Sequence, residues 1–294
     1  LSLLAFQWRV FDEARDRSNP LLERVRFLSI VAANLDEFFM IRVAGLEQQV
    51  AAGIGEPSPD GMTPVQQLAE IRREALWLTR ALAAYWQEEL LPRLDAEGIH
   101  VLDWPQLDPR QAAFARSYFD EMVMPVLTPL AFDPGRPFPH ISNLSQNLAV
   151  IVEDEGAERF ARIKVPDPLP RLVPLGRSAA TGDAAPGVRR RHSFVWLEQV
   201  VAANVDRLFP GVAVKGVHPF HVTRDAEVAI QELEAGDLLA SVEHGVRERR
   251  FGSVVRLVVT PSMPDAIRAL LVENLGVDAA DVQAVEAPLA LSGV

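Results

Sequence analysis

The chain has 294 residues, of which 49% are hydrophobic and 23% are charged, and its net charge is −11. This length and composition are typical of a globular protein with two domains and exclude a disordered or collagen-like chain. Cysteine is absent, which excludes disulfides, thiolate zinc sites and a cysteine nucleophile. The acidic balance argues against general nucleic-acid binding, and no apolar run approaches the roughly 20 residues of a membrane span.

The N-terminal part of the chain is predicted to be helical. Apolar residues recur every three or four positions after Ser2, which predicts a helix with Leu3 and Phe6 on its buried face. Asn19-Pro20 is typical of a helix start, so we expect a second helix there. Asn34 is expected to interrupt this second helix and to begin a further one.

A long helix is predicted after the Gly- and Pro-rich segment 53–64. Thr63-Pro64 is typical of its first residues, and it is expected to end before Gly98. Several helices joined by short turns predict an all-α bundle. We therefore expect an N-terminal helical domain over residues 1–105.

The second domain is expected to cover residues 106–294 and to combine helices with strands. Asp108-Pro109 predicts its first helix, and small residues make 178–187 a surface loop. Alternation of strands and helices predicts an α+β fold with one mixed sheet. The expected strands are 148–152, 159–165, 212–223, 253–260 and 282–286, and the expected helices are 196–208, 237–249 and 264–275.

The polar segment that begins at Asn34 is the densest candidate site. Asn34 and Glu37 have the spacing of a capping box, and this structural interpretation is favoured by spacing alone. The alternative is that the Asn34 amide pairs with the N6/N7 edge of adenine. In that case Phe27 and Phe38 are available as a stacking surface for the base.

Two further clusters contain histidine. The proline-rich segment 128–143 carries Arg136, His140 and Asn143, and a packed connection is favoured over a binding loop. His218 and His221 resemble a metal pair in spacing. Within a strand, however, residues three apart point to opposite faces, which argues against a shared metal ion.

Two arginine clusters, 189–191 and 247–250, are able to attract a polyphosphate or nucleic-acid backbone. The competing interpretation of each is an ordinary solvated surface. The chain has no Gly-x-Ser-x-Gly motif, and neither Lys164 nor Lys215 follows glycine as a P-loop requires. These observations predict no catalytic residue and no metal site within this chain.

Several segments, in order, resemble one family: the long bacterial polyphosphate kinases that are phosphorylated on histidine. The resemblance covers nearly the whole chain, and its motifs are long. The segments that resemble the N-terminal helical domain of the family are 1–10, 19–28 and 34–39 with Arg42. The segments that resemble its head domain are 124–130, 137–145, 147–150, 220–227, 237–239 and 249–256.

This resemblance implies an enzyme that reversibly polymerises the terminal phosphate of ATP into inorganic polyphosphate through a phosphohistidine. In the family, the catalytic histidine and the Mg²⁺ ligands lie in two C-terminal phospholipase-D-like domains, which nothing in this chain matches. The resemblance therefore implies the N-terminal and head regions of a longer protein. It also implies ATP and polyphosphate as partners, a homodimer or homotetramer, and a cytoplasmic location with peripheral membrane association as an option.

Two residues carry over from the family as candidates for binding ATP. The Asn of the Asn-Leu-Asp-Glu-Phe motif contacts ATP in the family, and here it is Asn34; Phe27 lies where an aromatic ring packs on the base. The chain departs from the family at Ala33, where a second Asn is common, and at His221, which takes the place of an Arg. The alternatives are a non-catalytic oligomerisation or polyanion-binding module and a relative without activity.

Overall fold

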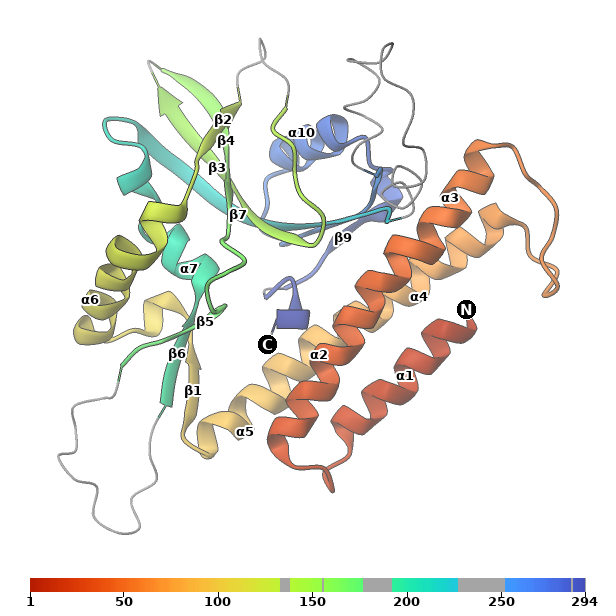
Figure 1. The fold of residues 1–294 in the computed structure, drawn as a ribbon, viewed down its shortest axis with the longest axis horizontal. Coiled ribbons are helices and arrows are strands. Elements are labelled where there is room, and N and C mark those ends of the chain that lie inside the picture. Colours follow the sequence, from red (N-terminus) through yellow and green to blue (C-terminus); the bar gives the residue numbers. More distant parts are fainter. Residues whose placement is uncertain (133–137, 155, 177–191, 227–251, 287, 294) are drawn as a thin grey trace, which may run out of the picture.

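The computed structural model describes residues 1–294 except 133–137, 155, 177–191, 227–251, 287 and 294. It places a bundle of long helices along one side of the molecule and a twisted mixed sheet on the other (Figure 1). The predicted fold class, a helical N-terminal region followed by a region with a mixed sheet, is confirmed. None of the helices within the described ranges is both long and apolar enough to cross a membrane.

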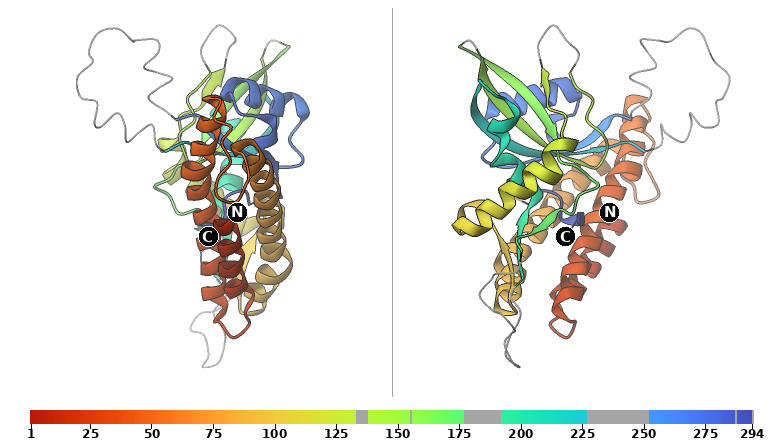
Figure 2. Two further views of the ribbon diagram at one scale, coloured as in Figure 1. Left: turned by 90° about the vertical axis from the view of Figure 1, so that its right-hand side faces the viewer. Right: turned by 60° about the vertical axis from the view of Figure 1, so that its left-hand side comes forward.

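The helical region is a bundle whose longest members run side by side (Figures 1 and 2). Thr63 caps α4 through a capping box with Gln66, because each side chain bonds the other residue's backbone N–H. Short π-helical turns at Phe39–Val43 and Trp86–Leu90 join successive helices. The helices are α1 (Ser2–Arg15), α2 (Leu21–Phe38), α3 (Ala44–Ala51), α4 (Pro64–Tyr85) and α5 (Leu91–Ala96).

Two details of the predicted bundle are wrong. Leu3 and Phe6 are 45% and 50% exposed, and the buried face of α1 is formed instead by Leu4, Phe11 and other residues at helical spacing. The α1 helix carries apolar residues on more than one face, so periodicity alone does not select the face that contacts α2. Asn34 does not interrupt its helix, because α2 runs unbroken to Phe38.

The main sheet has six strands in the order β2-β4-β3-β7-β8-β9. Its pairs are antiparallel except β8 with β9, so the sheet is mixed. One face packs on α10 (Asp265–Leu275), and the other carries side chains toward the helical bundle. The strands are β2 (Leu130–Phe132), β3 (Ser145–Asp154), β4 (Ala157–Lys164), β7 (Ala213–Arg224), β8 (Val254–Val259) and β9 (Val282–Ala284).

A second, three-stranded sheet connects the two regions. Strand β1 (Ile99–Leu102) follows the helical bundle directly and pairs in parallel with β6 (His192–Trp196), which also pairs with β5 (Leu172–Pro174). Two helices of the second region lie nearby, α6 (Pro109–Tyr118) and α7 (Leu197–Ala202). The sequence patterns did not predict β1, β2, β5 or β6, which are short. The domain boundary at residue 105 stays a prediction.

The other predicted strands and helices fall on observed elements. Strands predicted at 148–152, 159–165, 212–223, 253–260 and 282–286 correspond to β3, β4, β7, β8 and β9. The helices predicted from Asp108-Pro109 and over 264–275 correspond to α6 and α10. The helix predicted over 196–208 is shorter than expected: α7 ends at Ala202, and a separate 3-10 turn covers Val205–Leu208. The predicted helix 237–249 and the predicted loop 178–187 lie outside the described residues.

Candidate functional site

Asn34 lies on the side of α2 that faces α1. Its side-chain Nδ2 donates a hydrogen bond to Oε1 of Gln7 at 3.0 Å, and Gln7 is only 6% exposed. Because α2 is continuous here, the amide is not needed to cap a helix. Asn34 is half-buried, and its Oδ1 has no hydrogen-bond partner among the described residues. The amide therefore links two helices through its donor and leaves its acceptor available.

Phe27 lies two turns before Asn34 on the same side of α2, because seven residues nearly complete two turns. The helical rise separates the two positions by about 10 Å along the axis. The Phe27 ring lines a shallow groove against α1 together with Phe6 and Val10. The structure thus places both candidates at the α1–α2 contact, but it does not bring the ring and the amide together. Their role in binding ATP stays a prediction.

Phe38, the other candidate for stacking, is 8% exposed and buried in the bundle. Its ring makes an edge contact with Phe39, with the centroids 6.1 Å apart and the planes at 88°. A ring held in this way by the core is typical of packing and offers little surface to a base. Phe38 therefore acts in the core rather than as a stacking platform.

A buried ion pair joins the Asn34 motif to the sheet, and the sequence patterns did not predict it. Arg256 of β8 donates to Asp36 of α2 at 3.2 Å, and its Nη2 donates to Thr79 of α4 at 3.0 Å. Its Nε and Nη2 also donate to Gln283 at 3.0 and 2.8 Å, and its guanidinium lies 4.8 Å from the centre of the Phe39 ring. A signal existed: each partner is a charge within a run of apolar residues, and such charges are usually paired when buried.

Burial and the ion pair act in opposite directions on Asp36 and Arg256. Burial is the largest effect on Asp36 and raises the pKa of its carboxyl, while the Arg256 charge opposes this change. Burial likewise lowers the pKa of Arg256, and Asp36 opposes that shift. Each charge in this contact therefore depends on the other to remain ionised. The pair fixes α2, and with it Asn34, relative to the sheet.

His221 lies beside this ion pair, at the position where the family pattern has arginine. It is 3% exposed, and its Nδ1 has no hydrogen-bond partner among the described residues. With Asp36 and Arg256 it lines a cavity of about 30 Å³. Burial, and then the Arg256 charge, lower the pKa of His221 to about 3, so the imidazole is neutral at pH 7.

Three basic side chains, His140, Arg162 and Arg224, share one locality in the second region, and the described residues place no carboxylate in an ion pair with Arg162 or Arg224. Arg162 is 6% exposed and its Nε donates to Oδ1 of Asn147 at 2.8 Å, while Arg224 donates to backbone carbonyls such as that of Ile141 at 2.7 Å. Burial lowers the pKa of Arg162 to about 10 and also lowers that of Arg224. Burial, then Arg224 and Arg162, lower the pKa of His140. This basic cluster (His140, Arg162 and Arg224) has the chemistry of an anion site.

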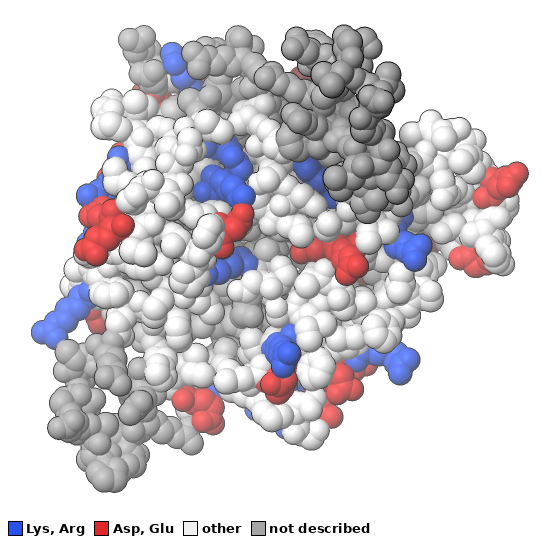
Figure 3. Space-filling view, viewed as in Figure 1, with Lys and Arg blue, Asp and Glu red and all other residues white. Residues whose placement is uncertain are grey.

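The remaining candidates from the sequence are not brought together. His218 and His221 both lie on β7, and within the described ranges no group of three or more His, Cys, Asp or Glu is arranged to hold a metal ion. Asn143 accepts a hydrogen bond from the backbone of Arg224 at 2.7 Å. Arg136 and the arginine clusters 189–191 and 247–250 lie outside the described residues. On the face seen in Figure 3, basic and acidic side chains are interspersed.

Family models and a solved structure match nearly the whole chain. The model described as the polyphosphate kinase N-terminal domain matches residues 1–102, and the model described as the polyphosphate kinase middle domain matches residues 110–294. Polyphosphate kinase 1 of Chlorobaculum tepidum is 44% identical over 295 residues, and polyphosphate kinase of Mycobacterium ulcerans is 43% identical over 296 residues. These alignments cover 99% and 100% of this chain.

The crystal structure of polyphosphate kinase from Porphyromonas gingivalis is similar with a TM-score of 0.77 and 26% identity over 99% of this chain. The chain covers 42%, 40% and 39% of the lengths of these three proteins, in the order given. The resemblance expected from the motifs is thereby confirmed. This chain belongs to the polyphosphate kinase family, of which it contains the N-terminal and middle domains.

Proposed function

We propose that the protein containing this chain is an ATP–polyphosphate phosphotransferase. The observation that carries this proposal is the alignment, in order and over the whole chain, with relatives named polyphosphate kinase. The reaction extends or shortens inorganic polyphosphate through a phosphohistidine, with Mg²⁺, in the part of the protein outside this chain. The N-terminal and middle domains then contribute to substrate binding, to domain packing and to assembly as a homodimer or homotetramer in the cytoplasm.

Asn34 is the residue of this chain that we assign to the adenine of ATP. Its free Oδ1 is a suitable acceptor for the exocyclic amine of adenine, since a carboxamide matches the N6/N7 edge with one acceptor and one donor. The donor, Nδ2, is engaged by Gln7 and becomes available when this contact opens. Phe27, in the adjoining groove, contributes apolar surface two turns away.

Steady-state kinetics of the full-length protein test this assignment. Asn34→Ala is expected to raise the KM for ATP about tenfold, the effect of losing hydrogen bonds worth about 1.4 kcal/mol. Gln7→Met frees Nδ2 of Asn34 and is expected to leave the KM unchanged or lower. The matched control is Asn274→Ala, which removes an exposed helical amide in α10. If Asn34→Ala and Gln7→Met impaired the enzyme alike, Asn34 would have only a structural role.

The basic cluster of His140, Arg162 and Arg224 is assigned to the phosphate chain. Buried guanidinium groups whose partners among the described residues are neutral, such as those of Arg162 and Arg224, gain stability when an anion supplies a counter-charge. Arg162→Gln in the full-length protein is expected to weaken polyphosphate binding. It is also expected to reduce the slope of the logarithm of the binding constant against the logarithm of the salt concentration by about one. Arg159→Gln, an exposed position on the same strand, is the control. Equal salt dependence in both variants would remove Arg162 from this role.

A non-catalytic polyanion-binding module is the second candidate, and the same basic cluster favours it. The two candidates differ in one measurement. Incubation of the full-length protein with ATP and Mg²⁺ yields acid-stable polyphosphate if it is a phosphotransferase, whereas a binding module retains polyphosphate without making it.

A further inference from the structure

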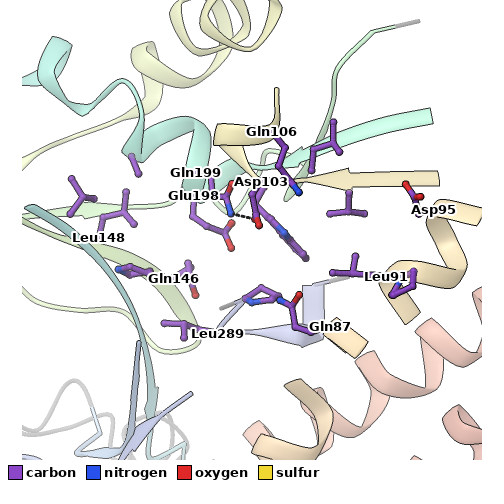
Figure 4. A pocket seen from close by; sticks show the side chains of 18 residues that line it. Gln87, Leu91, Asp95, Asp103, Gln106, Gln146, Leu148, Glu198, Gln199 and Leu289 are labelled. Atoms are coloured by element: carbon purple, nitrogen blue, oxygen red, sulfur yellow. Dashed lines mark hydrogen bonds between the residues drawn. The ribbon is translucent and has the colours of Figure 1, made fainter. Parts of the chain in front are cut away.

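A cavity of about 430 Å³ lies between the helical region and the main sheet, apart from the Asn34 contact and the basic cluster. Its apolar wall includes Leu91, Leu148 and Trp196. Figure 4 shows Leu91 and Gln87 on the side of the helical region, with Gln146 and Leu148 on the side of the sheet. A cavity of this size and mixed character is typical of a site for a small organic molecule.

Gln146 of β3 is an unsatisfied amide in the wall of this cavity. The residue is 8% exposed, and neither Nε2 nor Oε1 has a hydrogen-bond partner among the described residues. A buried polar group without a partner costs folding free energy, so such groups are usually satisfied by the protein, by water or by a ligand. The side chain offers a donor and an acceptor side by side, and this pair defines the ligand edge that fits it.

The charge of the lining disfavours phosphate. Three carboxylates line the cavity and each has a partner: Asp95 contacts His100, Asp103 accepts from Gln199 at 2.6 Å, and Glu198 accepts from Arg171 at 2.9 Å. None of the described lining residues is Lys or Arg. An anionic group entering this cavity would meet these carboxylates but no basic side chain among the described lining residues, so the cavity favours an uncharged ligand.

We propose that this cavity is a binding site for an adenine nucleoside without phosphates, with the Gln146 amide paired to the adenine base. A glutamine amide accepts from N6 of adenine and donates to N7. Rotation of the Gln146 side chain into the cavity would bring its two unpaired groups, which are covered in the unliganded structure, into contact with this edge of the base. The cavity wall of Leu91, Leu148 and Trp196 covers the apolar faces of the base. This site goes beyond the proposed function, since it is separate from Asn34 and rejects the phosphates of ATP.

Calorimetric titration of the full-length protein with adenosine tests the proposal. Wild-type protein is expected to bind adenosine saturably, and to bind inosine and AMP on the order of tenfold more weakly. Inosine has a carbonyl where adenosine has its amine, so it loses the bond to Oε1, and AMP adds a negative charge. Gln146→Leu is expected to weaken adenosine binding by a similar factor, since it keeps a side chain at this position but removes both polar groups.

Two controls separate this site from the proposed ATP site. Gln49→Leu, at an exposed position on α3, is expected to bind adenosine like the wild type. Asn34→Ala is expected to change the KM for ATP but not adenosine binding, while Gln146→Leu does the reverse. The proposal fails if wild-type protein binds no adenosine at millimolar concentration, as when the rest of the protein fills the cavity. It also fails if Gln146→Leu or inosine leaves the affinity unchanged.

Discussion

Replacement of Arg256 by methionine is expected to destabilise the chain strongly. The Arg256 and Asp36 side chains are 5% and 11% exposed, so the change leaves a buried carboxylate without its counter-charge. Loss of one partner of a buried ion pair typically costs about 3–5 kcal/mol. The hydrogen bonds to Thr79 and Gln283 and the contact with the Phe39 ring are lost as well, which favours the upper part of this range.

Chemical denaturation at pH 7, followed by circular dichroism and tryptophan fluorescence, measures this loss. Asp36→Asn combined with Arg256→Met is expected to cost less than the sum of the two single changes, by about 2 kcal/mol, because no charge remains buried alone. Arg26→Met is the control, since Arg26 forms an exposed pair with Glu23 and is expected to matter by less than about 0.5 kcal/mol. A loss below about 1 kcal/mol for Arg256→Met, or strict additivity, would refute the reasoning.

Three further predictions concern titration and helix capping. Burial, and then the Asp281 charge, raise the pKa of Glu47 to about 8. The folded chain therefore holds an extra proton between pH 4.5 and 8, and its stability falls as the pH rises through this range. Glu47→Gln should flatten this part of a pH series of denaturation curves, and an unchanged slope would contradict the prediction. The pKa of His221 is lowered to about 3, so the neutral imidazole contributes fully to the folding stability above pH 6.5, and this contribution is about 2 kcal/mol smaller at pH 5. His221→Gln should remove that acid sensitivity in the same assay, and an unchanged acid sensitivity would assign it to another group. Thr63→Ala should cost about 1 kcal/mol by loss of the α4 cap, measured from the denaturation midpoint, and no shift would show that the cap is dispensable.

Local patterns predicted the elements whose signals are local. The Thr63-Pro64 and Asp108-Pro109 pairs lie at the starts of α4 and α6, and each begins with a capping box. These signals operate within three or four residues, because a cap satisfies backbone N–H groups of the first turn. Long β-type runs were likewise predicted, as at β3 and β8.

Short strands and the choice of buried face were not predictable in the same way. Strand β1 has only four residues and exists through its pairing with β6, which is more than ninety residues later in the chain. Asn34 was expected to end a helix because of its residue type, but packing of α2 against α1 and α4 maintains the helix through it. Such packing routinely overrides the preference of a single residue.

The same distinction between local and tertiary determinants applies to the candidate site. The motif of Asn34 and the placement of the chain in its family were determined by the order of its residues, since long motifs identify a family without reference to contacts. Only the tertiary structure decided that Asn34 bonds Gln7, that Asp36 meets Arg256, and that Gln146 faces a cavity with no partner. These contacts join residues far apart in the sequence, and their energies depend on burial, which arises only when the helical bundle and the sheet pack together.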